Sequence, residues 1–253
     1  MLWRKAWMET RWRFLIGLAV LFCSAGSSVL LYPQVMKLLP MVPAADPSSP
    51  IVGQIREAAV LMRSYRGYIF AQWFRQNLSQ LWTIMAALLG SGGLLTQGAA
   101  LFTLSLPISR AQVSGVRALV GLGELLALAI LPTLLVPVLS PAVGQSYQVG
   151  EALVHAVCLF VAGTVFFSLA FLLSTAFADV WRPLLLSLAV AVALASVELL
   201  FFHPLSIHGI FGLMSGDTYF RTGVLPWLGL LASAAASAAM LWLATISISR
   251  RDF

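Results

Sequence analysis

Charged side chains are scarce in this sequence of 253 residues, and their scarcity excludes a soluble fold. Asp, Glu, Lys and Arg together make up 9% of the chain and 60% of the residues are hydrophobic, whereas soluble domains carry about 25% charged residues. A soluble protein of this length could not bury so much apolar surface. We therefore expect an all-α integral membrane protein with one domain, residues 1–253. The net charge of +6 is attributed to Lys and Arg at the cytoplasmic ends of helices, where they face anionic lipid. It is not interpreted as a sign of nucleic-acid binding.

The motifs of common enzymes are absent as well. The sequence has no phosphate-binding GxxxxGK[ST] loop, no HExxH, no CxxC and no GxSxG. We therefore expect a chain that is not itself an enzyme and that binds no cofactor or metal. Cys23 and Cys158 lie in apolar runs and are interpreted as buried hydrophobic residues. His203 and His208 are five residues apart, which is poor helical spacing for a shared metal.

Apolar runs of membrane-spanning length recur six times. About 20 residues at 1.5 Å each cross a hydrocarbon core of about 30 Å. Six spans place both termini on one side, and we expect that side to be the cytoplasm, with the chain in the cell inner membrane. Basic residues are concentrated in the short segments on that side, as cytoplasmic segments require. The predicted spans are residues 14–33, 78–102, 113–139, 152–176, 183–202 and 226–248.

Two further helices are predicted beside the spans. In Met1–Arg13, Trp3 and Trp7 share a helical face among basic residues, which indicates an interfacial helix on the cytoplasmic leaflet. A basic flank without a helix is the alternative. In Ile51–Trp73, apolar residues recur at spacings of three and four, which predicts an amphipathic helix in the first outer loop. We expect it to pack on the membrane or on a partner subunit.

Three ionisable residues lie inside the predicted spans, where they are costly. Glu124 has two interpretations: a polar lining of a substrate or proton path, or a structural hydrogen bond between helices. For His155 and Glu198 the structural hydrogen bond is favoured. Glycines in the second and third spans predict close approach of helices. They include Gly90, Gly92, Gly93, Gly115, Gly121 and Gly123.

The segment between the second and third predicted spans is a short polar break. Pro107 cannot donate a backbone hydrogen bond and disfavours a helical residue before it, so the arriving helix should end or kink near Leu106. Ser109 stands where an N-cap would stand for a helix from Ala111 onward. Arg110 adds a positive charge. The pattern predicts a membrane helix, a turn at the surface, and a second membrane helix.

The same segment carries a resemblance to a known family. Leu104-Ser105-Leu106-Pro107-Ile108-Ser109-Arg110 resembles the L-S-L-P-[VI]-S-R signature in the first cytoplasmic loop of type-2 ABC exporter permeases. In that family the segment is a short coupling helix that docks in a groove of the ATPase subunit. The final residues 250–253, RRDF, are also similar to the closing residues of many of these permeases. Residues 96–100 depart from the family, because they are uncharged where its members usually carry charges.

The resemblance implies the membrane-spanning permease subunit of an ATP-driven ABC exporter. Two permease subunits, as a homodimer or a heterodimer, would form the pathway, and ATP with Mg²⁺ would be held by two separate ATPase subunits. Leu106 and Pro107 would supply the apolar contact and the rigid shape, and Arg110 would pair with an acidic ATPase residue. The implied coupling loop is 104–113, with Ser105, Leu106, Pro107, Ile108, Ser109 and Arg110 as its contact residues.

Two other classes of protein stay open at this point. A secondary transporter or channel would need no ATPase, and it would be expected to show an inverted repeat and broken helices with charges at mid-membrane. No convincing repeat relates the first three predicted spans to the last three. An intramembrane enzyme or assembly factor would need a clustered nucleophile or metal set, which the sequence lacks. No residue pattern identifies a substrate.

Overall fold

The computed structural model describes residues 2–38, 61–92, 109–177, 179–201 and 209–249, and within them every regular element is a helix. The predicted all-α fold is therefore confirmed for this part of the chain. Helices suit an apolar sequence because they satisfy their backbone hydrogen bonds within one segment. In chain order the elements are α1 (Leu2–Leu30), α2 (Tyr32–Leu38), α4 (Tyr65–Ile69), η2 (Phe70–Leu78), α5 (Ser79–Ser91), α7 (Arg110–Leu139), η3 (Ser140–Val143), α8 (Val149–Ser174), α9 (Trp181–Phe201), α10 (Ile210–Ser215), α11 (Asp217–Thr222) and α12 (Trp227–Ser249).

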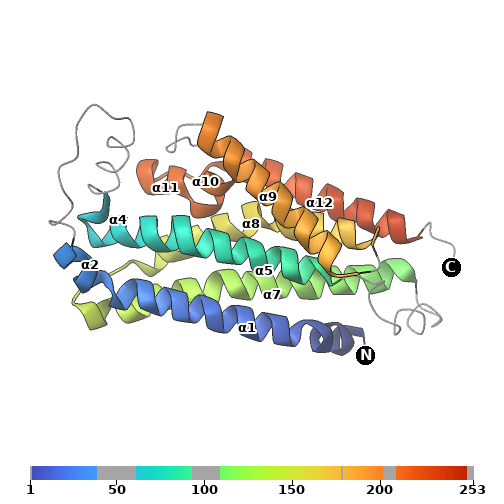
Figure 1. The fold of residues 1–253 in the computed structure, drawn as a ribbon, viewed down its shortest axis with the longest axis horizontal. Helices are drawn as coiled ribbons and strands as arrows, with labels where there is room; N and C mark the ends of the chain where they lie inside the picture. Colours follow the sequence, from blue (N-terminus) through green and yellow to red (C-terminus); the bar gives the residue numbers. More distant parts are fainter. Residues whose placement is uncertain (1, 39–60, 93–108, 178, 202–208, 250–253) are drawn as a thin grey trace.

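The long helices lie lengthwise in one bundle and alternate in direction along the chain (Figure 1). Leu2, Ser91, Arg110 and Ser249 consequently lie at one end, which we call the termini end. The opposite end, called the far end, holds α2, η3 and the short helices α10 and α11 (Figure 1). This arrangement brings the two sides of the predicted coupling loop to the same end as the beginning of α1.

Five stretches of the described chain are long and apolar enough to cross a membrane. Each includes most or all of one predicted span. The predicted second span, 78–102, is not among the five, and its residues 93–102 lie outside the described part. The chain is thus compatible with a membrane protein, while the second of the six predicted spans stays a prediction. The five stretches are Leu2–Lys37, Ala111–Val143, Val149–Ser174, Trp181–Glu198 and Trp227–Ser249.

The boundary predicted between an interfacial helix and the first span, at Arg13, does not exist in the structure. Residues 2–30 form the single helix α1. The reason is that one stripe of buried residues runs across the predicted boundary at spacings of three and four. Trp12, which is 65% exposed, lies on the opposite side of the helix from this stripe. The stripe includes Ala6, Thr10, Phe14, Gly17, Leu21 and Ala25.

The stretch from Tyr65 to Ser91 also differs from the prediction. An amphipathic helix ending at Trp73 and a separate span beginning at Leu78 were expected, but α4, η2 and α5 follow one another without a gap. The predicted apolar stripe is present, since Tyr65, Ile69 and Trp73 are all buried. They are buried inside the bundle instead of lying on an outer surface. The beginning of the predicted helix, residues 51–60, lies outside the described residues.

The central position of this stretch explains its mixed composition. The part η2 is a π-helix, whose wider turns change the face that each residue presents. Trp73 and Trp82 have 0% exposure and are the largest fully buried side chains of the described chain. Arg75 and the neighbouring amides make the sequence too polar for a simple span. Burial of large aromatic rings stabilises it within the bundle instead.

Two glycines confirm the expected close approach of helices, and two do not. A Cβ at Gly90 would lie 2.5 Å from the carbonyl oxygen of Phe167 in α8, and one at Gly121 would lie 2.7 Å from the Phe167 ring. Gly115 and Gly123 have no atom within 4 Å of such a Cβ among the described residues. Of these four glycines, Gly90 and Gly121 make the close contacts, and both lie against α8.

We predict that Gly90→Ala lowers the thermal unfolding temperature of the detergent-solubilised protein, because the added methyl group would push α5 away from the α8 backbone. Overpacking of this kind typically costs about 1–3 kcal/mol. Gly123→Ala is the matched control, and it should be neutral or stabilising because alanine favours a helix by up to about 1 kcal/mol. Equal unfolding temperatures for the two variants would contradict the close contact.

Candidate functional site

The structure describes the chain up to Gly92 and again from Ser109, which lies within the predicted coupling loop, 104–113. The side-chain oxygen of Ser109 accepts a hydrogen bond from the backbone N–H of Gln112 at 3.2 Å, and its backbone is extended. Ser109 is therefore the N-cap of α7, as predicted. Arg110 is the first residue of that helix. Residues 104–108 of the signature lie outside the described residues.

An ion pair joins α1 to the beginning of α7. The Nη2 atom of Arg117 lies 3.2 Å from Oε2 of Glu9, and both side chains are mostly buried. Arg117 follows Arg110 by seven residues, which is two helical turns and about 10 Å of rise. Glu9 is therefore fixed close to the residues that follow the signature. A partly buried pair such as this one is screened less by salt than a surface pair.

A second arginine joins α1 to the end of α5. The Nη1 atom of Arg13 donates to the carbonyl oxygen of Leu88 at 3.4 Å, in the last turn of α5. Carbonyl groups at a helix C-terminus lack partners in the helix and attract cations. A Cβ at Gly92 would lie 2.7 Å from Nη1 of Arg13 and 3.7 Å from Nη2 of Arg117. Both guanidinium groups thus lie beside Gly92, the last residue of this part of the chain that the structure describes.

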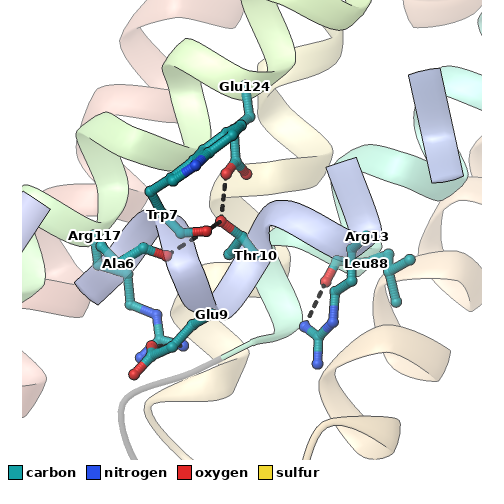
Figure 2. A network of polar contacts seen from close by, with 8 residues as sticks. All are labelled: Ala6, Trp7, Glu9, Thr10, Arg13, Leu88, Arg117 and Glu124. Carbon is teal, nitrogen blue, oxygen red and sulfur yellow. Dashed lines mark hydrogen bonds and ion pairs between the residues drawn. The ribbon is translucent and has the colours of Figure 1, made fainter. Parts of the chain in front are cut away.

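The buried carboxyl group of Glu124 completes this group of contacts. Its Oε1 atom accepts a hydrogen bond from the hydroxyl of Thr10 in α1, and that hydroxyl also lies 3.2 Å from the carbonyl oxygen of Ala6 (Figure 2). Glu124 is 4% exposed, and its Oε2 atom has no hydrogen-bond partner among the described residues. The carboxyl group faces α1, so its position favours the structural interpretation over a substrate path.

Together these contacts connect three helices at the termini end. Glu9, Thr10 and Arg13 project from one face of α1, toward Arg117 and Glu124 of α7 and toward the last turn of α5 (Figure 2). Two acidic and two basic side chains balance one another in this group. We call these five residues the α1 contact group. They hold the two helices that flank the coupling loop against α1.

Sequence reasoning missed most of the α1 contact group. Residues 1–13 were interpreted as a basic surface segment, and their one acidic residue, Glu9, received no role. An acidic residue among basic ones was a signal for an internal ion pair. Thr10 gave no signal, since a lone threonine indicates nothing by itself. The pairing also depended on α1 being one helix with α7 beside it, which the predicted boundary at Arg13 did not suggest.

The other two ionisable residues inside the predicted spans lie toward the far end. His155 Nδ1 lies 2.7 Å from the carbonyl oxygen of Ser215, and Oε1 of Glu198 accepts from the N–H of Phe211 at 3.0 Å. Both contacts are the structural hydrogen bonds that were favoured. Within the described residues no group of three His, Cys, Asp or Glu side chains could hold a metal ion. His203 and His208 lie outside that part.

Comparisons with protein-family models, with curated proteins and with solved structures found no match for this chain. These comparisons therefore do not assign the chain to a family. The functional hypothesis depends on the residues of the signature, on the bundle that brings both sides of the loop to the termini end, and on the polar contacts that hold those sides in place.

We predict that Thr10→Val destabilises the protein. Valine has a similar shape but no hydroxyl, so both oxygens of the buried Glu124 carboxyl group would lack a partner. Leaving a buried polar group without a partner costs about 1–3 kcal/mol. Thr10→Ser keeps the hydroxyl and is the control. The measurement is the thermal unfolding temperature in detergent, and a valine variant as stable as the serine variant would contradict the assigned contact.

Proposed function

We propose that this chain is the membrane-spanning permease subunit of an ATP-driven ABC exporter. The observation that carries the proposal is the seven-residue signature, Leu104 to Arg110. Ser109 of the signature is the N-cap of α7. A helix that begins at this point is what a surface turn between two membrane helices requires. ATP and Mg²⁺ would be bound by two separate ATPase subunits. The chain itself would bind the ATPase and respond to it, without catalysing hydrolysis.

The α1 contact group supports a way in which this response could travel. A force on the loop would act on the helices that precede and follow it in the chain, α5 and the first turns of α7. Arg13 contacts the first side, while Glu9 and Thr10 contact Arg117 and Glu124 on the second. The three helices would therefore move as one unit when the ATPase subunits close. Without such contacts, a displaced loop could bend without moving α1.

Within the loop, each residue type suits a different part of the docking contact. Leu106 would enter an apolar groove, and Pro107 would limit the conformations of the loop. Arg110 would pair with an acidic residue of the ATPase, because a guanidinium group binds a carboxylate in a defined geometry. Ser105, Ile108 and Ser109 complete the proposed contact, in which Ser109 also keeps its role as N-cap.

The proposed setting is the cell inner membrane, with the termini end on the cytoplasmic side. The described part of that end carries Arg4, Lys5, Arg11 and Arg13 of α1, in agreement with the bias of basic residues toward the cytoplasm. A second permease subunit, identical or related, would complete the pathway. Much of the surface of α9 and α12 is apolar and exposed within this chain, so lipid or the second subunit can cover it.

The proposal predicts that a P-loop ATPase copurifies with the tagged chain from detergent-solubilised membranes of its own cells. Combined Pro107→Gly and Arg110→Glu substitutions should release the ATPase, because they loosen the loop and reverse its charge. Arg110→Glu alone should uncouple ATP hydrolysis from transport. Arg182→Glu is the matched control. It changes an exposed arginine of another turn at the termini end, which pairs with Asp179, and should not affect copurification.

A chain that purifies without an ATPase would contradict the proposal and favour a secondary transporter or channel. Equal release of the ATPase by Arg182→Glu and by the loop variants would argue against docking at residues 104–110. Mass spectrometry identifies the copurifying protein by its GxxxxGK[ST] segment, so the test does not depend on knowing the substrate.

We predict that Glu124→Gln leaves both the stability and the ATP hydrolysis of the purified complex close to those of the parent. Glutamine keeps an oxygen that can accept the hydrogen bond from Thr10, so the contact between α1 and α7 should persist. Normal assembly with loss of activity would instead support the alternative in which Glu124 lines a substrate or proton path.

A further inference from the structure

The first turns of α1 continue the helix that crosses the bundle, whereas the sequence predicted a separate helix on the membrane surface. Residues 2–30 form one helix along an edge of the bundle (Figure 1). With the predicted span, residues 14–33, in the hydrocarbon core, the residues before it extend through the headgroup layer at the termini end. Side chains on the outer side of these turns therefore face lipid headgroups.

The two sides of this segment differ in charge. Glu9 is directed inward onto Arg117, and Arg13 contacts the last turn of α5 (Figure 2). The acidic side chain of the segment is therefore used inside the bundle. Arg4 and Arg11 are seven residues apart and lie on the other side of the helix from Glu9. The internal ion pair leaves this outer side positively charged.

Exposed apolar side chains share the outer side with the two arginines. Met8 lies between them along the helix and is 48% exposed, and Leu15 continues the same side at 45% exposure. Trp12 adjoins them. Exposed tryptophan is typical of the boundary between headgroups and hydrocarbon. We call Arg4, Met8, Arg11, Trp12 and Leu15 the outer face of α1.

Arg11 has unused hydrogen-bonding capacity on this face. Its Nε atom has no hydrogen-bond partner among the described residues, and its Cζ atom lies 5.6 Å from the centre of the Trp12 ring. A guanidinium group has five N–H donors and no acceptor, and it binds phosphate oxygens in a bidentate geometry. Arg4 is exposed two helical turns away, about 10 Å along the axis. Both long side chains can extend to a phosphate at the level of Met8.

The outer face continues into the predicted span. Ile16 is 61% exposed and Val20 is 41% exposed. Cys23, which was expected to be buried, is exposed as well. One surface therefore runs from the two arginines to apolar residues at membrane depth. A phospholipid has its charged and apolar parts in this order, whereas an acidic segment of a soluble protein would match the arginines alone.

We propose that the outer face of α1 is a binding site for an anionic phospholipid of the leaflet at the termini end. Arg4 and Arg11 bind its phosphate, Trp12 lies at the boundary between headgroup and chains, and Leu15 contacts the beginning of an acyl chain. These contacts come from side chains and do not depend on the backbone N–H groups at the beginning of α1. The site goes beyond the proposed exporter function, since it requires neither an ATPase nor the coupling loop.

Photo-crosslinking from the middle of the face tests the proposal. Benzoylphenylalanine replaces Met8 in the full chain, which is reconstituted into nanodiscs of equal parts phosphatidylglycerol, which is anionic, and phosphatidylcholine, which is zwitterionic, with identical acyl chains. Mass spectrometry separates the two lipid adducts of the α1 peptide. The anionic adduct should exceed the zwitterionic adduct by more than tenfold. Arg4→Gln and Arg11→Gln should each lower this ratio about fivefold, the effect of removing one basic residue at about 1 kcal/mol near an anionic surface.

Arg182→Gln is the matched control, because it removes an exposed arginine of α9 at the same end, and it should leave the ratio at position 8 unchanged. Benzoylphenylalanine at Val190, an exposed residue in the middle of α9, should give equal adducts. The proposal is overturned if both lipids crosslink equally at position 8, or if Arg182→Gln lowers the ratio as much as Arg4→Gln. In native membranes, protein adducts in place of lipid at position 8 would assign the face to an acidic protein and would also overturn the lipid site.

Discussion

The contact between α1 and α7 is the interaction on which the termini end of the bundle depends. In a chain with so few charges, each polar group inside the helix bundle needs a partner within the protein. Thr10 with Glu124 and Glu9 with Arg117 provide such partners. These two contacts hold the first turns of α1 beside α7. With Arg13 on the last turn of α5, they also hold the end of α5 and the beginning of α7 beside α1.

Features that depend on neighbours in the chain could be predicted. Long apolar runs indicated the positions of α7, α8, α9 and α12 to within a few residues, because a helix in lipid must continue until its apolar run ends. The cap at Ser109 followed from its place after Pro107 and before an apolar run. The turn before Pro183 was also expected, and there Asp179 accepts from the N–H of Arg182 at 2.8 Å.

Features that depend on residues distant in the chain could not be predicted. The residues from Tyr65 to Asn77 are too polar to indicate a span, and only the assembled bundle shows that their aromatic face is central. The α10–α11 hairpin consists of two helices of six residues, defined by the turns at Gly216 and Gly223. The pairing of Thr10 with Glu124 joins residues 114 positions apart, and no local pattern indicates such a pair.

The central claim is that residues 104–110 bind an ATPase, and photo-crosslinking in living cells tests it most directly. Photoreactive benzoylphenylalanine replaces Ser105 in one protein and Gln145, an exposed residue of the far end, in a second. The account predicts that position 105 crosslinks to a protein with a GxxxxGK[ST] segment and that position 145 does not. Crosslinks from position 105 that contain no such protein, or equal yields of it from both positions, would contradict the account.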